Sequence, residues 1–196
     1  MDYFDLLQHR TSVRKFTDQP LTEEELNQIL TAGNMAPVGS RRYEDVHLTV
    51  IRDRAVLDEL SLAAAQRSAN KRVQEDIIIS DTATGKKYSQ VDPFFAAPAV
   101  IIVSHRKQEV QPGIEYCNVT CVTLAMQLAA VELGLGSVFL WFALESMRLL
   151  PELDRTPLLN LPDGFEPLLG LAVGHPAAPA DLRALNTDKL SVNYIG

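Results

Sequence analysis

The longest apolar stretch of the chain, from Cys117 to Leu133, constrains the fold most strongly. A stretch that is apolar on nearly all sides predicts a helix that protein covers on most of its surface. Gly134 follows directly, and glycine favours the left-handed conformation in which many helices end. A chain of 196 residues is long enough to bury about 70% of the surface that it exposes when unfolded. We therefore expect one domain, residues 1–196, built around a central helix.

Four shorter segments have the pattern of strands. Ala99–Val103 is continuously apolar and rich in β-branched residues, which is typical of a buried strand, and Leu168–Val173 is a second core strand. Val46–Ile51 alternates with one mostly apolar face, and Val138–Trp141 follows the turn after the central helix. A few strands interleaved with helices predict an α+β layered fold.

Two helices are predicted near the amino end. Asp2–Gln8 carries its large apolar residues on one side, with Asp2 as the capping residue, and this helix stops near Arg10. Thr22 and Glu25 have the pattern of a capping box. The Thr22 hydroxyl can accept from the backbone amide of Glu25, and the Glu25 carboxylate can accept from the backbone amide of Thr22. The second helix ends in the Gly33–Pro37 region, where glycine, asparagine and proline follow one another closely.

Three other features carry less specific patterns. A helix is expected after Asp53. The polar stretch from Gln66 to Pro93 has no sustained helix or strand periodicity in its apolar residues, and this is typical of a lid or a crossing loop. Cys117 and Cys121 are four residues apart on one face of the central helix. We interpret them as two small core residues, not as a disulfide framework or a redox pair.

Charge limits the partners of the chain. A formal net charge of −7 disfavours general attraction to nucleic acid and to anionic membranes. Asp2 and Asp5 stand at the amino end, where a signal peptide carries basic residues, and no uninterrupted apolar run reaches the ~18 residues of a membrane span. We expect a cytoplasmic protein with neither nucleic acid nor membrane as partner, so any site for an anion must be local.

The segment Arg10–Arg14 has the composition of such a local anion site. Its two guanidiniums and two hydroxyls suit a phosphate monoester, because arginine offers a planar fork of donors and stays charged. The alternative interpretation is a solvated, charged turn. The four histidines lack metal-ligand spacing and no nucleophile motif is present, so we predict no metal site and no catalytic triad.

Five segments in the chain, taken in order, resemble the nitroreductase family of flavin enzymes. The resemblance covers nearly the whole chain and implies an FMN-binding α+β fold with a central, mostly antiparallel sheet flanked by helices. It also implies an intertwined homodimer with two active sites at the interface. The segments are Arg10–Phe16, the capped helix that ends at Met35–Pro37, Ala97–Val103, Leu133–Ser137 and Leu171–Pro176.

The same resemblance implies residues that bind the phosphate end of FMN. Arg10 and Ser12 would hold the phosphate, with Thr11 in the same segment, and Arg14 would lie near the pyrimidine edge of the ring. A cation there favours the negatively charged reduced flavin. Arg183 would be the late basic residue that reaches the phosphate. Its alternative for this role is Lys189.

Further site residues follow from the resemblance, together with one departure from it. The backbone around Leu140, Trp141 and Phe142 would pass along the flavin and donate an amide to the ring. Many family members carry Pro-Ser-x-x-Asn-x-Gln-Pro-Trp after the capped helix, whereas the Asn, Gln and Trp are missing from residues 37–45 here. Ser40 or Arg41 would still contact the partner's flavin, but the substrate side of the pocket must be built differently.

The resemblance implies an NAD(P)H-dependent FMN oxidoreductase. It would reduce a small conjugated acceptor, such as a nitro compound or a quinone, by a ping-pong mechanism, with no catalytic acid or base. Two alternatives stay open. The first is a flavin enzyme with another reaction, such as reductive dehalogenation or flavin breakdown. The second is a non-catalytic protein that stores or senses flavin.

Overall fold

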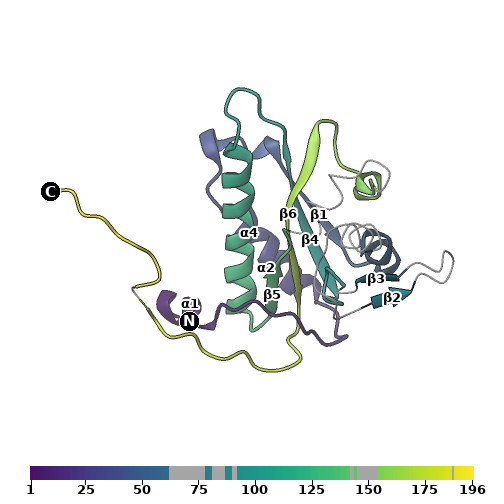
Figure 1. Cartoon of the computed structure of the whole chain (residues 1–196), viewed down its shortest axis with the longest axis horizontal. Helices are drawn as coiled ribbons and strands as arrows, with labels where there is room; N and C mark the ends of the chain where they lie inside the picture. Colours follow the sequence, from purple (N-terminus) through teal and green to yellow (C-terminus); the bar gives the residue numbers. More distant parts are fainter. Residues whose placement is uncertain (62–77, 81–86, 90–91, 142–143, 145–153, 187) are drawn as a thin grey trace.

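The computed structural model describes residues 1–61, 78–80, 87–89, 92–141, 144, 154–186 and 188–196. Within these ranges a four-stranded antiparallel sheet stands between two layers of helix and loop (Figure 1). The α+β fold and the central antiparallel sheet expected from the sequence are confirmed.

The sheet has the strand order β1-β4-β6-β5. Strands β4 and β6 form its centre, and every described residue of β4 except Arg106 is buried. The continuous apolar run at 99–103 therefore belongs to a strand that is covered on both faces. The strands are β1 (Val46–Ile51), β4 (Ala99–Arg106), β5 (Gly136–Phe139) and β6 (Phe165–Gly174).

Helices α2 (Glu23–Asn34) and α4 (Ile114–Glu132) cover one face of the sheet, and they also pack against each other (Figure 1). Their buried residues and the inward side chains of β4 and β6 form one apolar core, in which Ile29, Ile101 and Met126 are fully buried. In the part of the chain that the structure describes, α4 is long and apolar enough to cross a membrane by length and composition. The expected helix is present and packs in this core, but Tyr116, Cys117 and Leu124 on it are exposed, so the single chain does not cover it on most of its surface as the sequence predicts.

A second apolar core lies on the opposite face of the sheet. It contains Leu57 and Leu60 from the helical residues 54–61, together with Phe94 and Leu159. Leu159 ends the short helix η4 (Thr156–Leu159). The helix expected after Asp53 is therefore present in the described residues, and it covers this face.

The amino end lies near the lower end of α4, whereas the carboxyl end lies far from it (Figure 1). Helix α1 (Tyr3–His9) starts at Asp2, whose carboxylate accepts from the amides of Phe4 and Asp5, and it buries none of its residues. The amino group of Met1 is 3.0 Å from the carboxylate of Glu132 at the end of α4. The carboxyl-terminal tail, 177–196, leaves the body of the domain after β6, and its last residues extend into solvent (Figure 1).

The structure corrects three details of the sequence analysis. Cys117 is exposed and Cys121 is half-buried, so they are not two core residues. The strand expected at 138–141 begins at Gly136 and ends at Phe139, because its pairing with β6 runs from Gly136 to Phe139. The polar stretch 66–93 contains two short paired strands, β2 (Ile78–Ser80) and β3 (Lys87–Ser89), and most of its other residues lie outside the described ranges.

The capping box of α2 gives a stability prediction. The Thr22 hydroxyl accepts from the Glu25 amide at 3.1 Å, and the Glu25 carboxylate accepts from the Thr22 amide at 2.7 Å. We expect Thr22→Ala to lower the free energy of unfolding by about 1 kcal/mol, because it leaves a helix-end donor without its partner. Urea unfolding monitored by circular dichroism measures this loss. An unchanged midpoint would contradict it.

The same box predicts a dependence of stability on pH. The Thr22 backbone amide lowers the pKa of Glu25 below its usual 4.5 by bonding the charged carboxylate. A lowered folded-state pKa means that this stabilisation is complete above the unfolded value and is lost as pH falls through the folded value. Glu25→Gln should therefore reduce the loss of stability in acid. Unfolding at neutral pH and below about pH 4 compares the two proteins.

Candidate functional site

The segment Arg10–Phe16 lies along the free edge of β5. The Val13 amide donates to the Ser137 carbonyl at 3.0 Å, and Phe16 forms a bridge with Pro176 beyond β6. The Thr17 amide donates to the His175 carbonyl at 2.9 Å, and the Ala177 amide donates to the Lys15 carbonyl. The backbone of the predicted anion segment is thus fixed to two strands at one end of the sheet.

Close packing sets this segment on the sheet. A Cβ on Gly136 would stand 2.6 Å from Cγ1 of Val13, and a Cβ on Gly174 would stand 2.5 Å from the ring of Pro98. Both positions therefore need glycine for space. The approach at Gly136 brings Val13 against the start of β5.

Arg10 and Arg183 are brought together although 173 residues separate them. The Arg183 guanidinium donates to the Arg10 carbonyl at 3.1 Å, and the Arg183 amide donates to the Gln8 carbonyl at 3.0 Å. The side-chain amide of Gln8 donates to the Arg183 carbonyl at 3.2 Å. The tail is therefore held against the end of α1 by backbone and side-chain bonds.

The two guanidiniums lie in an unfavourable electrostatic setting. Burial, and then the charge of Arg183, lower the pKa of Arg10 from its usual range. Among the residues that the structure describes, neither arginine has a carboxylate within ion-pair distance. Two like charges side by side without a counter-charge are stabilised when an anion binds between them.

Thr11 lines a cavity that neither Arg10 nor Arg14 lines. Together with Val13 it lines a cavity of about 310 Å³ between the start of β5 and the tail. Arg10, Ser12 and Arg14 are not among the residues that line this cavity, which agrees with the alternation of side chains along an extended segment. Other residues on its wall include His9, Leu135, Ser137, Pro179 and Leu182.

Arg14 is exposed and near an aromatic ring. Its guanidinium carbon is 5.9 Å from the centre of the Phe95 ring, and its Nη1 donates to the Ser12 carbonyl at 3.4 Å. Phe95 and the next residue, Ala96, both have positive φ angles, which are unusual for residues other than glycine. The loop that contains Phe95 and Ala96 is held by the Asp92 carboxylate. This carboxylate accepts from two side chains and two backbone amides, those of Arg54, Ser61, Phe94 and Ala96.

Ser40 and Arg41 lie far from Arg10 and Arg183 in the same chain. They belong to the turn η1 (Gly39–Arg41), whose Gly39 amide donates to Asn118 near the start of α4. Val13 and Gly136 lie beyond the other end of α4. A helix rises about 1.5 Å per residue, so the two groups are about 20 Å apart along α4. In Figure 1, α1 lies near the lower end of α4 and the blue turns lie near its upper end.

Leu140 and Trp141 follow β5. The Leu140 amide donates to the Gly170 carbonyl at 2.8 Å, and its side chain is buried in the second core. Leu140 is therefore not available to donate its amide to a ligand. Trp141 is half-exposed, with its ring centre 6.0 Å from that of Tyr116 on α4, and Phe142 lies outside the described residues.

Lys189, the alternative to Arg183, lies in the exposed part of the tail.

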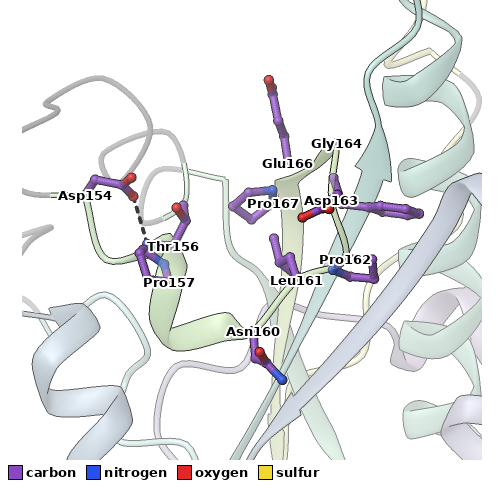
Figure 2. Close-up of a pocket in the computed structure, with 11 residues that line it drawn as sticks. Asp154, Thr156, Pro157, Asn160, Leu161, Pro162, Asp163, Gly164, Glu166 and Pro167 are labelled. Carbon is purple, nitrogen blue, oxygen red and sulfur yellow. Dashed lines mark hydrogen bonds between the residues drawn. The ribbon is translucent and has the colours of Figure 1, made fainter.

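A larger hollow of about 670 Å³ lies between η4 and the start of β6, and Figure 2 shows Asp154, Asp163 and Glu166 around it. The Asp154 carboxylate accepts from the Thr156 amide at 2.8 Å. No lysine or arginine is present among the described residues that line it, so this hollow does not suit a phosphate.

Comparison with known proteins identifies the family. The family model described as "Nitroreductase family" matches residues 7–175, which include both the Arg10–Arg14 segment and the whole sheet. The chain belongs to the nitroreductase family. The resemblance that carries the sequence analysis is thereby confirmed.

Relatives of this nitroreductase-family chain agree with the assignment. It is 30% identical over 186 residues to the "FMN reductase [NAD(P)H]" of Bacillus subtilis, an alignment that covers 88% of this chain and 64% of that protein. The chain thus spans less than two thirds of the length of this relative. It is 27% identical to the "Iodotyrosine deiodinase" of Nematostella vectensis, with 96% of this chain and 72% of that protein covered.

Solved structures of the family share the fold. A nitroreductase with bound FMN from Bacteroides fragilis superposes with a TM-score of 0.78 and 23% identity, covering all of both chains. A nitroreductase with bound FMN from Desulfitobacterium hafniense gives a TM-score of 0.77 and 19% identity, with 97% of each chain covered.

Sequence reasoning missed two parts of the site region. His105 and Asn118, both buried, connect the Gly39 turn to the interior. A single polar residue in an apolar helix carries no periodic signal, and neither does a histidine at the end of a strand. The Asp45 carboxylate beside them bonds Arg42 at 2.6 Å, and this bond is the main reason that its pKa lies below the usual 3.8.

Proposed function

We propose that this chain binds FMN and uses it as an NAD(P)H-dependent oxidoreductase that reduces a small conjugated acceptor. The observation that carries the proposal is the pair Arg10 and Arg183: the Arg183 guanidinium is bonded to the Arg10 carbonyl, its charge lowers the pKa of Arg10, and neither arginine has a carboxylate partner among the described residues. The phosphate of FMN would supply the missing negative charge. Relatives that carry the names of FMN and NADPH-flavin reductases support the same assignment.

The residues present fit FMN at the amino-terminal segment. Arg10, Ser12 and Arg183 would hold the phosphate through charge-assisted hydrogen bonds, and Thr11 would support the segment from the cavity side. Arg14 would stand beside the ring, where its charge favours the reduced, anionic flavin. Bound FMN would supply the redox chemistry that connects NAD(P)H with the acceptor. The protein supplies binding, orientation and this positive charge, and we propose no side chain as acid or base.

We propose a homodimer as the form that completes the site. Ser40 and Arg41 are about 20 Å from Arg10 along α4, so within one chain they cannot reach the same small molecule. A second copy can bring its Ser40–Arg41 turn to the first copy's Arg14. Exposed apolar side chains on three elements favour such a contact: Tyr3 and Phe4 on α1, Tyr116 and Leu124 on α4, and Leu182, Leu185 and Leu190 in the tail.

The dimer gives a prediction with a matched control. Leu124 is 42% exposed on α4, and Leu158 is 45% exposed on η4, on the other side of the sheet. We expect the wild-type protein to be a dimer, Leu124→Glu to be monomeric or weakly associated, and Leu158→Glu to remain a dimer. Size-exclusion chromatography with light scattering measures the mass. A monomeric wild type would refute the proposed assembly.

The proposed activity is tested by steady-state kinetics of the FMN-loaded protein. Varying NADPH at several fixed concentrations of menadione should give parallel double-reciprocal lines, because the donor must leave before the acceptor enters. NADH in place of NADPH determines the donor preference. If the FMN-loaded protein oxidised neither donor, the proposal would fail and flavin storage would become the better interpretation. A cytoplasmic location stays a prediction.

A further inference from the structure

The turn that carries Ser40 and Arg41 is anchored to the interior by three consecutive contacts. The Gly39 amide donates to Oδ1 of Asn118 at 2.9 Å, and Nδ2 of Asn118 is 3.0 Å from Nε2 of His105. Nδ1 of His105 is 2.6 Å from the Arg106 carbonyl. Asn118 and His105 are 4% and 1% exposed, so water cannot replace these partners.

We call these contacts, from Gly39 through Asn118 and His105 to Arg106, the relay. Its donors and acceptors have one consistent assignment. A backbone amide can only donate, so Oδ1 of Asn118 accepts from Gly39 and its Nδ2 faces His105 as a donor. Nε2 of His105 must then accept, and the ring proton is on Nδ1, which donates to the Arg106 carbonyl. In this assignment the His105 ring is held in one orientation, and each group fixes the orientation of the next.

The relay holds a strained turn. Ser40 and Arg41 have φ angles of 55° and 59°, a left-handed conformation that side chains other than glycine rarely adopt. The backbone of the turn packs closely on α4, since a Cβ at Gly39 would stand 3.0 Å from Cδ1 of Ile114. Two consecutive residues in this conformation persist only when their surroundings fix them, and strain of this kind is concentrated at functional sites.

The strained turn presents an uncommitted cation. The neighbouring Arg42 is bonded to Asp45 at 2.6 Å and lies 3.9 Å from Glu44. Arg41 is exposed, and no carboxylate in the described part of the chain lies within ion-pair distance of its guanidinium. Of the two adjacent arginines, one is therefore held by the fold and the other is free to meet a ligand.

We propose that His105 and Asn118 are positioning residues that fix this turn so that Arg41 selects substrates carrying an oxyanion at the partner's flavin. This inference rests on the proposed function, since it needs a flavin site formed by two copies. The oxyanion has two possible sources: the additional phosphate of NADPH, or a carboxylate on the acceptor. Both offer the negatively charged oxygen atoms that a guanidinium binds in fork geometry.

The experiment measures two selectivity ratios in the FMN-loaded protein. One is kcat/KM for NADPH against NADH with menadione as a neutral acceptor. The other is kcat/KM for 4-nitrobenzoate against nitrobenzene with one fixed donor. We expect at least one ratio to favour the anionic compound by about tenfold in the wild type and to fall towards one in Arg41→Gln. Arg52→Gln, which removes an exposed cation that is paired with Glu23, is the control and should keep both ratios.

A pair of variants at His105 tests the relay itself. His105→Leu removes the acceptor for Asn118 and should lower the same ratio that Arg41→Gln lowers, although Arg41 is still present. His105→Gln places an amide oxygen near the position of Nε2 and should restore it. Hydrogen exchange of the Gly39 amide, measured by NMR without flavin, should be faster in His105→Leu than in wild type and His105→Gln.

The outcomes separate this inference from the proposed function. A wild type without flavin-dependent turnover refutes the proposed function, and the selection by Arg41 fails with it. A wild type that turns over but discriminates in neither ratio, or an Arg41→Gln variant that discriminates as well as wild type, overturns only the inference. Faster Gly39 exchange in His105→Leu with unchanged ratios overturns the positioning role. Arg41 is exposed, so its variant is expected to fold normally.

Discussion

Arg10→Ala is expected to weaken FMN binding about 10- to 150-fold. A hydrogen bond to a charged group contributes about 1.5–3 kcal/mol, and Arg10 stands beside Arg183 where the phosphate would bind. The flavin-free variant should be no less stable than wild type, because removing Arg10 also removes its repulsion with Arg183. Loss of affinity without loss of stability is the signature of an anion site.

Titration of flavin fluorescence measures the affinity, and thermal unfolding without flavin measures the stability. Arg52→Ala is the matched control, since Arg52 is an exposed arginine that pairs with Glu23 on α2. It should leave FMN affinity unchanged. An Arg10→Ala variant that keeps wild-type affinity would place the phosphate elsewhere.

Gly136→Ala is expected to cost about 1–3 kcal/mol of stability and to weaken FMN binding with it. The added Cβ would stand 2.6 Å from Cγ1 and 2.8 Å from Cβ of Val13. Val13 cannot easily retreat, because its amide is bonded to the Ser137 carbonyl and its side chain is β-branched. The variant must therefore displace the segment that holds Arg10, Ser12 and Arg14.

A second substitution distinguishes displacement of the segment from general damage. Val13→Gly removes all three side-chain atoms that the new Cβ would meet, so Gly136→Ala with Val13→Gly should recover FMN affinity relative to Gly136→Ala alone. Val13→Gly alone supplies the baseline. If the double variant binds FMN no better than Gly136→Ala, then the contact with Val13 does not position the site.

The elements of the fold were predictable where a local pattern determines them. The capping box of Thr22 and Glu25, the buried run at 99–103 and the left-handed Gly134 each follow from neighbouring residues, and each is present in the structure. The exposed face of α4 was not predictable in this way. An apolar stretch looks the same whether its own chain or another copy covers it, and Cys117 is exposed in the single chain.

The site was predictable only in part, for the same reason. The Arg10–Arg14 segment is recognisable from five adjacent residues, whereas its contact with Arg183 depends on how the tail returns after β6. The hydrogen bond from the Leu140 amide to the Gly170 carbonyl depends on where β5 ends. The relay through His105 and Asn118 joins residues from three elements, and no single stretch of sequence contains it.

We propose that positively charged residues at the amino-terminal segment and the tail bind an FMN that NAD(P)H reduces. The most direct test incubates the purified protein with excess FMN, removes the unbound flavin and records the visible spectrum before and after anaerobic addition of NADPH and of NADH. We predict one bound FMN per chain, bleaching of the oxidised flavin band by at least one donor, and its return when menadione is added. Protein that retains no flavin after this treatment would contradict the account.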